Sequence, residues 1–262
     1  RDGRIKPAVV APGLFTVSAA TNRVVPGPSC DNAQSSGTSM AAPTAAGLGA
    51  LVRQYFTDGY HPSGSARPAD AFSPSAALVK ATLIASAVDL STLGCQADPI
   101  PSRDQGWGLI QLDTALAFSG DANRLLVDDH LNGFAAPSDA PVTRRVVVTE
   151  PGPLKVVLAW TDAPSSSLAA VHLVNDLDLV VRGPGGDYRG NVFAAGRSVE
   201  GGQADRLNNV EVVFLPDAEK GVWTIEVAPH AIPAPAQDFA LVVTGPVRLD
   251  EGPRSATGRV TP

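Results

Sequence analysis

Ser39 is the residue whose sequence setting best suits covalent chemistry. It stands in the stretch from Ser36 to Pro43, SGTSMAAP, which leads into the small, apolar run from Thr44 to Val52. A serine at the start of a helix lies beside free backbone N–H groups and the positive end of the helix dipole. Those groups would stabilise the negative oxygen that develops when a serine attacks a peptide carbonyl. The pattern therefore favours acyl transfer on Ser39.

The helix that would carry Ser39 has almost no polar side chains before Arg53, so we expect it to be buried. A serine that only caps a buried helix is the structural alternative. Two other nucleophile patterns are excluded. An α/β-hydrolase elbow needs glycine where Ala41 stands, and the Ser-x-x-Lys pattern needs lysine where Ala42 stands.

The segment from Gly37 to Pro43 resembles the nucleophile motif of the subtilisin-like serine proteases, the subtilases. Two further segments, GRIKPAVVAPG from Gly3 and QGWGLI from Gln105, also resemble subtilase segments, so the resemblance covers roughly residues 3 to 120. It implies a hydrolase: a secreted serine endopeptidase that acts on protein or peptide substrates and forms its acyl-enzyme on Ser39.

A serine becomes a good nucleophile only with a histidine as base and a carboxylate that orients it. In subtilases the Asp, the His and the oxyanion Asn precede the Ser, yet residues 1 to 38 contain no histidine. We therefore expect these groups upstream of Arg1, and we expect the chain by itself, a C-terminal part of a protease, to be inactive. We interpret the four histidines as isolated and non-catalytic; they are His61, His130, His172 and His230.

The alternative from another class is a non-catalytic fragment whose β module binds protein or carbohydrate. A complete upstream gene encoding the Asp and His motifs would favour the protease, whereas a protein that truly begins at Arg1 would favour the binding module.

The elements that would position these groups change in character near Leu125. The resemblance implies that residues 1–122 are the C-terminal part of an α/β subtilase domain. Helical spacing predicts helices after Ser75 and from Leu112 to Phe118. Residues 123–247 contain short β-branched runs separated by turn residues, which predicts an all-β antiparallel sandwich or jelly-roll barrel. Residues 248–262 are expected to be a polar tail or linker.

The β-rich part carries a second resemblance. VNDLDL from Val174, LNNVE from Leu207 and GVWTIEV from Gly221 resemble the C-terminal β-barrel of certain bacterial alkaline subtilases. That module is similar to the P domain of kexin-like proteases. We expect Trp160 and Trp223 to anchor its core.

Asp176 and Asp178 are two residues apart, so on a strand both carboxylates face one side. Hard oxygen ligands of this kind suit calcium, and calcium is usual in the family that the chain resembles. The plain alternative is two polar residues where a loop enters a strand. No histidine and cysteine pattern suits zinc.

Cys30 and Cys95 are compatible with one disulfide or with two free thiols. Secretion, which the resemblance implies, favours the disulfide.

Composition limits the partners. The formal net charge of −6 argues against nucleic acid and anionic membranes, and no uninterrupted apolar stretch approaches the length of a membrane span. Hydrophobic residues make up 44% of the 262, enough for proper cores in two domains. We expect a monomer without nucleic-acid or membrane partners.

Overall fold

A computed structural model describes residues 2–20 and 31–250. The chain is mostly β-sheet with few helices. The first part holds β1 (Thr16–Ala20), β2 (Asp31–Ser35), α1 (Thr38–Thr57), η1 (Pro68–Asp70), α2 (Ala76–Ala85), β3 (Ala87–Val88), η2 (Leu90–Leu93), β4 (Leu109–Ile110) and η3 (Leu112–Thr114). The second holds β5 (Arg124–Phe134), β6 (Val142–Val148), β7 (Gly152–Ala159), β8 (Asp176–Gly183), β9 (Gly186–Ala194), β10 (Arg197–Glu200), β11 (Val210–Ala218), β12 (Gly221–Ala231), β13 (Gln237–Gly245) and β14 (Val247–Leu249).

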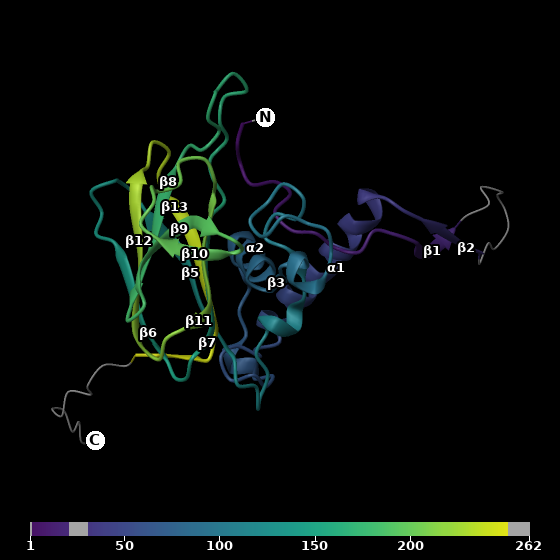
Figure 1. Ribbon diagram of the computed structural model, residues 1–262, viewed down its shortest axis with the longest axis horizontal. Coiled ribbons are helices and arrows are strands. Elements are labelled where there is room, and N and C mark those ends of the chain that lie inside the picture. Colours follow the sequence, from purple (N-terminus) through teal and green to yellow (C-terminus); the bar gives the residue numbers. More distant parts are fainter. Residues whose placement is uncertain (1, 21–30, 251–262) are drawn as a thin grey trace.

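The strands after residue 123 form two open antiparallel sheets (Figure 1). One has six strands in the order β10-β9-β8-β12-β6-β14, and the other has four in the order β11-β7-β13-β5. A core of apolar side chains from both sheets lies between them, and it includes Trp160 and Trp223, which are 1% and 0% exposed. The expected core role of both tryptophans and the antiparallel pairing are thus confirmed.

The four-stranded sheet is buried on both faces. On β7, Leu154, Val156 and Leu158 point into the core between the sheets, whereas Val157 and Ala159 join a second core with α2. This alternation follows the period of two along a strand. The helix α2 packs on β7 and β13, so the second core joins the two parts of the chain. The division at residues 122 and 123 stays a prediction, and the second core spans it.

The helix α2 begins where the sequence predicts. Ser75 is its N-cap, and its hydroxyl accepts a hydrogen bond from the Leu78 N–H at 3.0 Å. The same hydroxyl donates to Asp129 Oδ1 at 2.6 Å, so the cap is also tied to β5.

The other predicted elements differ in detail. The segment after Leu112 forms only the short 3₁₀ turn η3, and Val247–Leu249 pairs with β6 as β14, where a polar tail was expected to begin. Without β14, the strand β6 would be the edge of its sheet, and its backbone groups would be free to pair. The segment pairs there, and Val247 packs in the core between the sheets, where it is 2% exposed.

The helix α1 differs most from its prediction. It forms as expected, but none of its residues before Val52 is buried, and the buried ones are Val52, Tyr55 and Phe56 at its C-terminal end. Figure 1 shows the reason: the N-terminal half of α1 and the pair β1–β2 project away from the sheets. The prediction of a buried helix is wrong for this chain, because no described element covers that half.

Candidate functional site

Ser39 lies in the first turn of α1 and is exposed. Gly37 caps the helix with a φ of 148°, and its carbonyl accepts from the Met40 N–H at 3.0 Å. Neither the hydroxyl nor the backbone N–H of Ser39 hydrogen bonds to another residue that the structure describes. The N–H therefore remains available for an oxyanion, as acyl transfer on the neighbouring hydroxyl requires.

The segment Ala11-Pro12-Gly13 holds this turn in place. The Gly37 N–H donates to the Gly13 carbonyl at 2.8 Å, and the Phe15 N–H donates to Ser36 Oγ at 2.9 Å. A Cβ at Gly13 would lie 2.7 Å from the Gly37 carbonyl oxygen, so only glycine permits this approach. Two segments that the sequence marked separately are thus neighbours.

The histidines do not lie beside Ser39. His61 follows the far end of α1, a helix of 20 residues and hence about 30 Å long. Its ring lies 6.0 Å from that of Phe56, and burial lowers its pKa. His130 stacks on Phe239 at 4.7 Å, and His230 is an exposed residue of β12. None of these three hydrogen bonds to Ser39 in the described residues.

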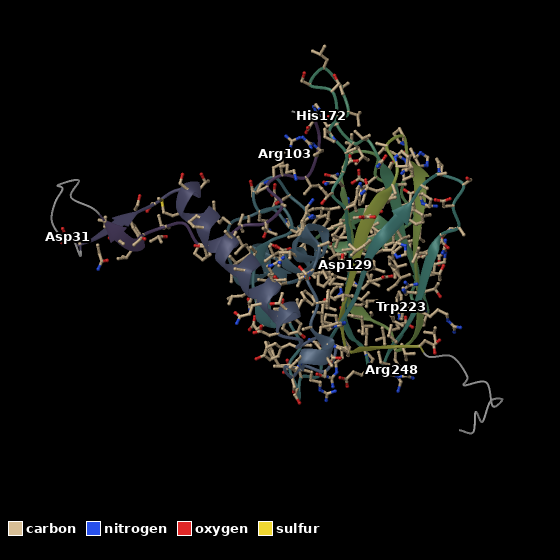
Figure 2. All side chains as sticks on the ribbon, turned by 180° about the vertical axis from the view of Figure 1, so that it is seen from behind. Asp31, Arg103, Asp129, His172, Trp223 and Arg248 are labelled. Carbon is tan, nitrogen blue, oxygen red and sulfur yellow. The ribbon has the colours of Figure 1, made fainter. Side chains whose placement is uncertain are left out.

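His172 belongs to a serine–histidine pair that sequence reasoning missed. Its Nδ1 lies 2.8 Å from Ser165 Oγ, on the loop that projects beyond the sheets (Figure 2). The nearby Asp162 does not complete a triad, because its carboxylate accepts instead from the backbone N–H groups of Val174 and Asn175 at 2.7 and 2.8 Å. No motif surrounds Ser165, so spacing alone offered no signal.

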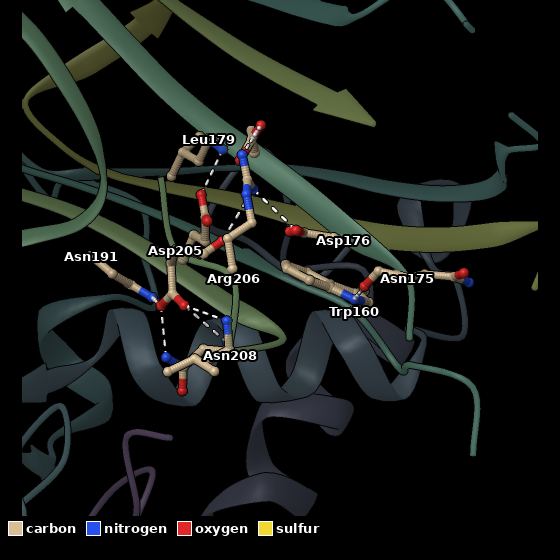
Figure 3. A network of polar contacts seen from close by, with 11 residues as sticks. Trp160, Asn175, Asp176, Leu179, Asn191, Asp205, Arg206 and Asn208 are labelled. Atoms are coloured by element: carbon tan, nitrogen blue, oxygen red, sulfur yellow. Dashed lines mark hydrogen bonds and ion pairs between the residues drawn. The ribbon is translucent and has the colours of Figure 1, made fainter. Parts of the chain in front are cut away.

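Asp176 and Asp178 are two residues apart on β8, and both form an ion pair with the same arginine. Figure 3 shows Arg206 beside Asp176. Arg206 Nη1 lies 3.1 Å from Asp176 Oδ2 and 2.6 Å from Asp178 Oδ1. The guanidinium thus stands where a cation between the two carboxylates would sit, so a calcium ion would compete with Arg206 for them. No cluster of three or more metal-ligating side chains occurs in residues 2–20 and 31–250.

Other acids surround this ion pair. Asp205 accepts from the side chains of Asn191 and Asn208 at 2.5 and 2.6 Å. Glu211 is 1% exposed, and only one of its oxygens has a hydrogen-bond donor among the described residues, the Leu179 N–H at 2.6 Å. Sequence reasoning missed Arg206 and Glu211, because neither lies near Asp176 in the chain.

Burial dominates the titration of this cluster. It raises the pKa of Glu211 well above its usual range, and the charges of Asp178, Asp205 and Asp176 raise it further. Burial likewise raises the pKa of Asp176 to about 6, although Arg206 opposes this. Both acids are therefore harder to ionise in the folded chain than in the unfolded one.

Glu211→Gln is expected to raise the unfolding midpoint at pH 8 by several degrees and to leave it nearly unchanged at pH 4. A carboxyl whose pKa is raised by folding keeps its proton in the folded chain, so it destabilises the fold as the pH rises above its unfolded pKa. Glutamine carries no charge and still accepts from the Leu179 N–H. Melts from pH 4 to 8 provide the measurement, with the half-exposed Glu226→Gln as the control. Equal shifts at both pH values would contradict the prediction.

Calcium at Asp176 and Asp178 stays a prediction, and Arg206→Gln tests it. We expect this variant to lose about 2 kcal/mol of stability at pH 7, because two carboxylates lose their cation while Arg206 itself is partly exposed. Calcium should restore part of the melting temperature in the variant and change that of the unsubstituted chain much less. Melts with calcium and with EDTA decide this. If EDTA destabilises the unsubstituted chain strongly, the ion binds with Arg206 present.

Cys95 is exposed on the loop after η2. Its predicted partner, Cys30, lies outside the described residues, so the disulfide stays a prediction. In the part of the chain that the structure covers, no helix is both long and apolar enough to cross a membrane.

Comparison with known proteins shows what the chain is similar to. Residues 1–108 match the subtilase family, Peptidase S8. Over 92% of its length the chain is 31% identical to the serine protease/ABC transporter B family protein tagA of Dictyostelium discoideum, and over 93% it is 28% identical to tagB of the same organism.

The chain spans only 14% of tagA and 16% of tagB. The family match contains Ser39 together with the Gly13 turn that supports it. Residues 1–108 are therefore similar to a segment of the subtilase family of serine proteases.

Proposed function

We propose that this chain is part of a subtilisin-like serine endopeptidase in which Ser39 forms the acyl-enzyme. The observation that carries the proposal is the exposed Ser39 in the first turn of α1, with an unbonded backbone N–H, inside a segment similar to subtilases. The hydroxyl would attack the peptide carbonyl, and the Ser39 N–H would donate to the resulting oxyanion.

The base and its orienting carboxylate would come from sequence outside these 262 residues. In support, no described histidine hydrogen bonds to Ser39, and the half of α1 that carries it is exposed. Packing of further sequence on that half would bury the apolar side chains from Met40 to Leu51 and bring a histidine to Ser39.

The finer parts of the proposal concern fold and setting. Residues 1–122 would be the C-terminal part of an α/β catalytic domain, with the parallel bridge between Val10 and Leu109 as one trace of its sheet. The following strands would form the barrel-like module of alkaline subtilases. The enzyme would be secreted and monomeric and would act on proteins or peptides. From the relatives' names we carry over only the protease part, because the family match is to subtilases.

Fluorophosphonate labelling tests the proposal. We expect the full-length protein to be labelled on Ser39, as mapped by peptide mass spectrometry, and the 262-residue chain to show only trace labelling because it lacks a base. Absence of label on Ser39 in the full-length protein would overturn the proposal. Label on Ser165 instead would point to the pair with His172.

A further inference from the structure

A cavity of about 680 Å³ lies where the four-stranded sheet meets the segment after α2. We name it the junction cavity and define it by Ala87, Asp89, Lys155, Arg197, Phe214 and Thr244. Its volume falls within the range of small-molecule sites, and side chains such as Ile100, Pro153 and Pro216 make most of its surface apolar. It is separate from Ser39, which is not among its lining residues.

One row of three residues across the sheet forms a wall of this cavity. Lys155 on β7 pairs in register with Phe214 on β11 and with Thr244 on β13. Lys155 also shares its face of β7 with Val157 and Ala159. Lys155 is therefore a charged residue on a face of β7 that is apolar farther along the strand.

The helix α2 covers this face of the sheet only as far as the row of Lys155, Phe214 and Thr244. Val157 and Ala159 lie in the core with α2, but α2 ends at Ala85. The following Ala87 lines the cavity with Ala85, and neither has a side chain large enough to fill it. The junction cavity is thus the place where the helix no longer covers the sheet.

The ammonium group of Lys155 is incompletely bonded. The residue is 9% exposed, and its Nζ donates to the Ala87 carbonyl at 2.6 Å and lies 4.9 Å from the centre of the Phe214 ring. An ammonium has three donor hydrogens, and no second acceptor and no carboxylate within 4.0 Å occurs among the described residues. Burial lowers its pKa to about 8, so a counter-anion would relieve a real cost.

The charge of Asp89 opposes the effect of burial on the Lys155 pKa, but Asp89 forms no ion pair with Lys155 within 4.0 Å. Asp89 accepts at Oδ1 from the Ser91 N–H at 2.9 Å and from Gln105 Nε2 at 2.7 Å, and at Oδ2 from the Ile100 N–H at 3.2 Å. Both of its oxygens therefore accept hydrogen bonds from groups other than Lys155. The other two charged residues of the lining, Asp113 and Arg197, carry one charge of each sign.

We propose that the junction cavity binds a monocarboxylate with an apolar body. The carboxylate would accept from Lys155 Nζ and from the Thr244 hydroxyl, which makes no hydrogen bond to another described residue. The apolar body would lie against Phe214, Pro216 and Ile100. A free acid and the C-terminal residue of a peptide share this chemistry. The inference goes beyond the proposed peptidase activity and does not depend on it.

Calorimetry with the 262-residue chain provides the test, with phenylacetate as the probe and phenylacetamide as its uncharged match. A ligand of this size should bind with a dissociation constant of about 10 mM or tighter. The amide should bind at least about tenfold more weakly, because it loses a hydrogen bond between charged groups. This comparison needs no variant and holds whatever substitutions do to folding.

Variants then locate the site. Lys155→Met should bind phenylacetate at least about tenfold more weakly and remove the preference over the amide. Lys80→Met is the matched control, a half-buried lysine outside the cavity lining, and should keep both. Thr244→Val tests the second donor without a change of size. The proposal is overturned if acid and amide bind equally, if neither binds at the concentration above, or if Lys155→Met keeps the preference.

A second set of titrations distinguishes a free acid from a peptide C-terminus as the ligand of the junction cavity. An acetylated dipeptide ending in phenylalanine and its C-terminal amide are titrated in the same way. Tighter binding of the dipeptide acid than of phenylacetate supports a peptide C-terminus as occupant. Binding of phenylacetate alone supports a free acid.

Discussion

Replacing Ser39 with alanine in the full-length protein is expected to lower kcat for peptide hydrolysis by about a millionfold, with little change in KM. Ser39 would supply the electron pair that forms the acyl-enzyme. Among the described residues in the first turn of α1, only Thr38 also combines a hydroxyl with an unbonded backbone N–H. The loss falls on kcat because the covalent bond exists only beyond substrate binding. Steady-state kinetics on a peptide substrate measure it.

Ser35→Ala is the matched control, since Ser35 is an exposed hydroxyl of β2 four residues before Ser39. It should retain activity within about twofold, as surface substitutions do. Loss of activity in both variants would indicate damage to the β1–β2 region, and full activity of Ser39→Ala would exclude Ser39 as the nucleophile.

A truncated chain of residues 123–250 is expected to lose cooperative folding and to aggregate, although it contains all strands of both large sheets. The outer face of the four-stranded sheet carries Val157, Val210, Val212 and Val242, none more than 6% exposed. These lie in the core that α2 completes. Uncovering the four valines removes about 6 kcal/mol or more, which is comparable with the whole stability of many domains.

Polar links across the same boundary would also be lost. Ser75 Oγ donates to Asp129, Lys155 Nζ to the Ala87 carbonyl, and the Ile5 N–H to Asn208 Oδ1 at 2.8 Å. The lysine would keep its charge on an exposed apolar sheet. A chain of residues 73–250 is the control, because it keeps α2, β3 and β4.

Urea unfolding followed by circular dichroism distinguishes the two truncated chains. We expect a single cooperative transition for residues 73–250 and either a broad transition or insoluble protein for residues 123–250. A soluble, cooperative 123–250 with the same midpoint as the longer chain would show that α2 contributes nothing to the sheet.

Local sequence decided much of this protein. The N-cap at Ser75, the helix that starts at Thr38, the strand runs and the buried tryptophans follow from periodicity, capping and turn residues. Ser39 could be singled out because its helix start and the Gly13 turn each lie within a few consecutive residues. Such signals survive in sequence because the interactions that produce them join near neighbours.

Only the tertiary structure decided what the polar groups contact. Arg206 reaches Asp178 from 28 residues away, and Lys155 reaches the Ala87 carbonyl from 68 away. No periodicity reports such partners, because they depend on sheet order and on where α2 ends. The exposure of α1 is of the same kind. Its sequence states that an apolar surface exists, but burial requires a second surface in contact with it, and that depends on the packing of whole elements rather than on the composition of the helix.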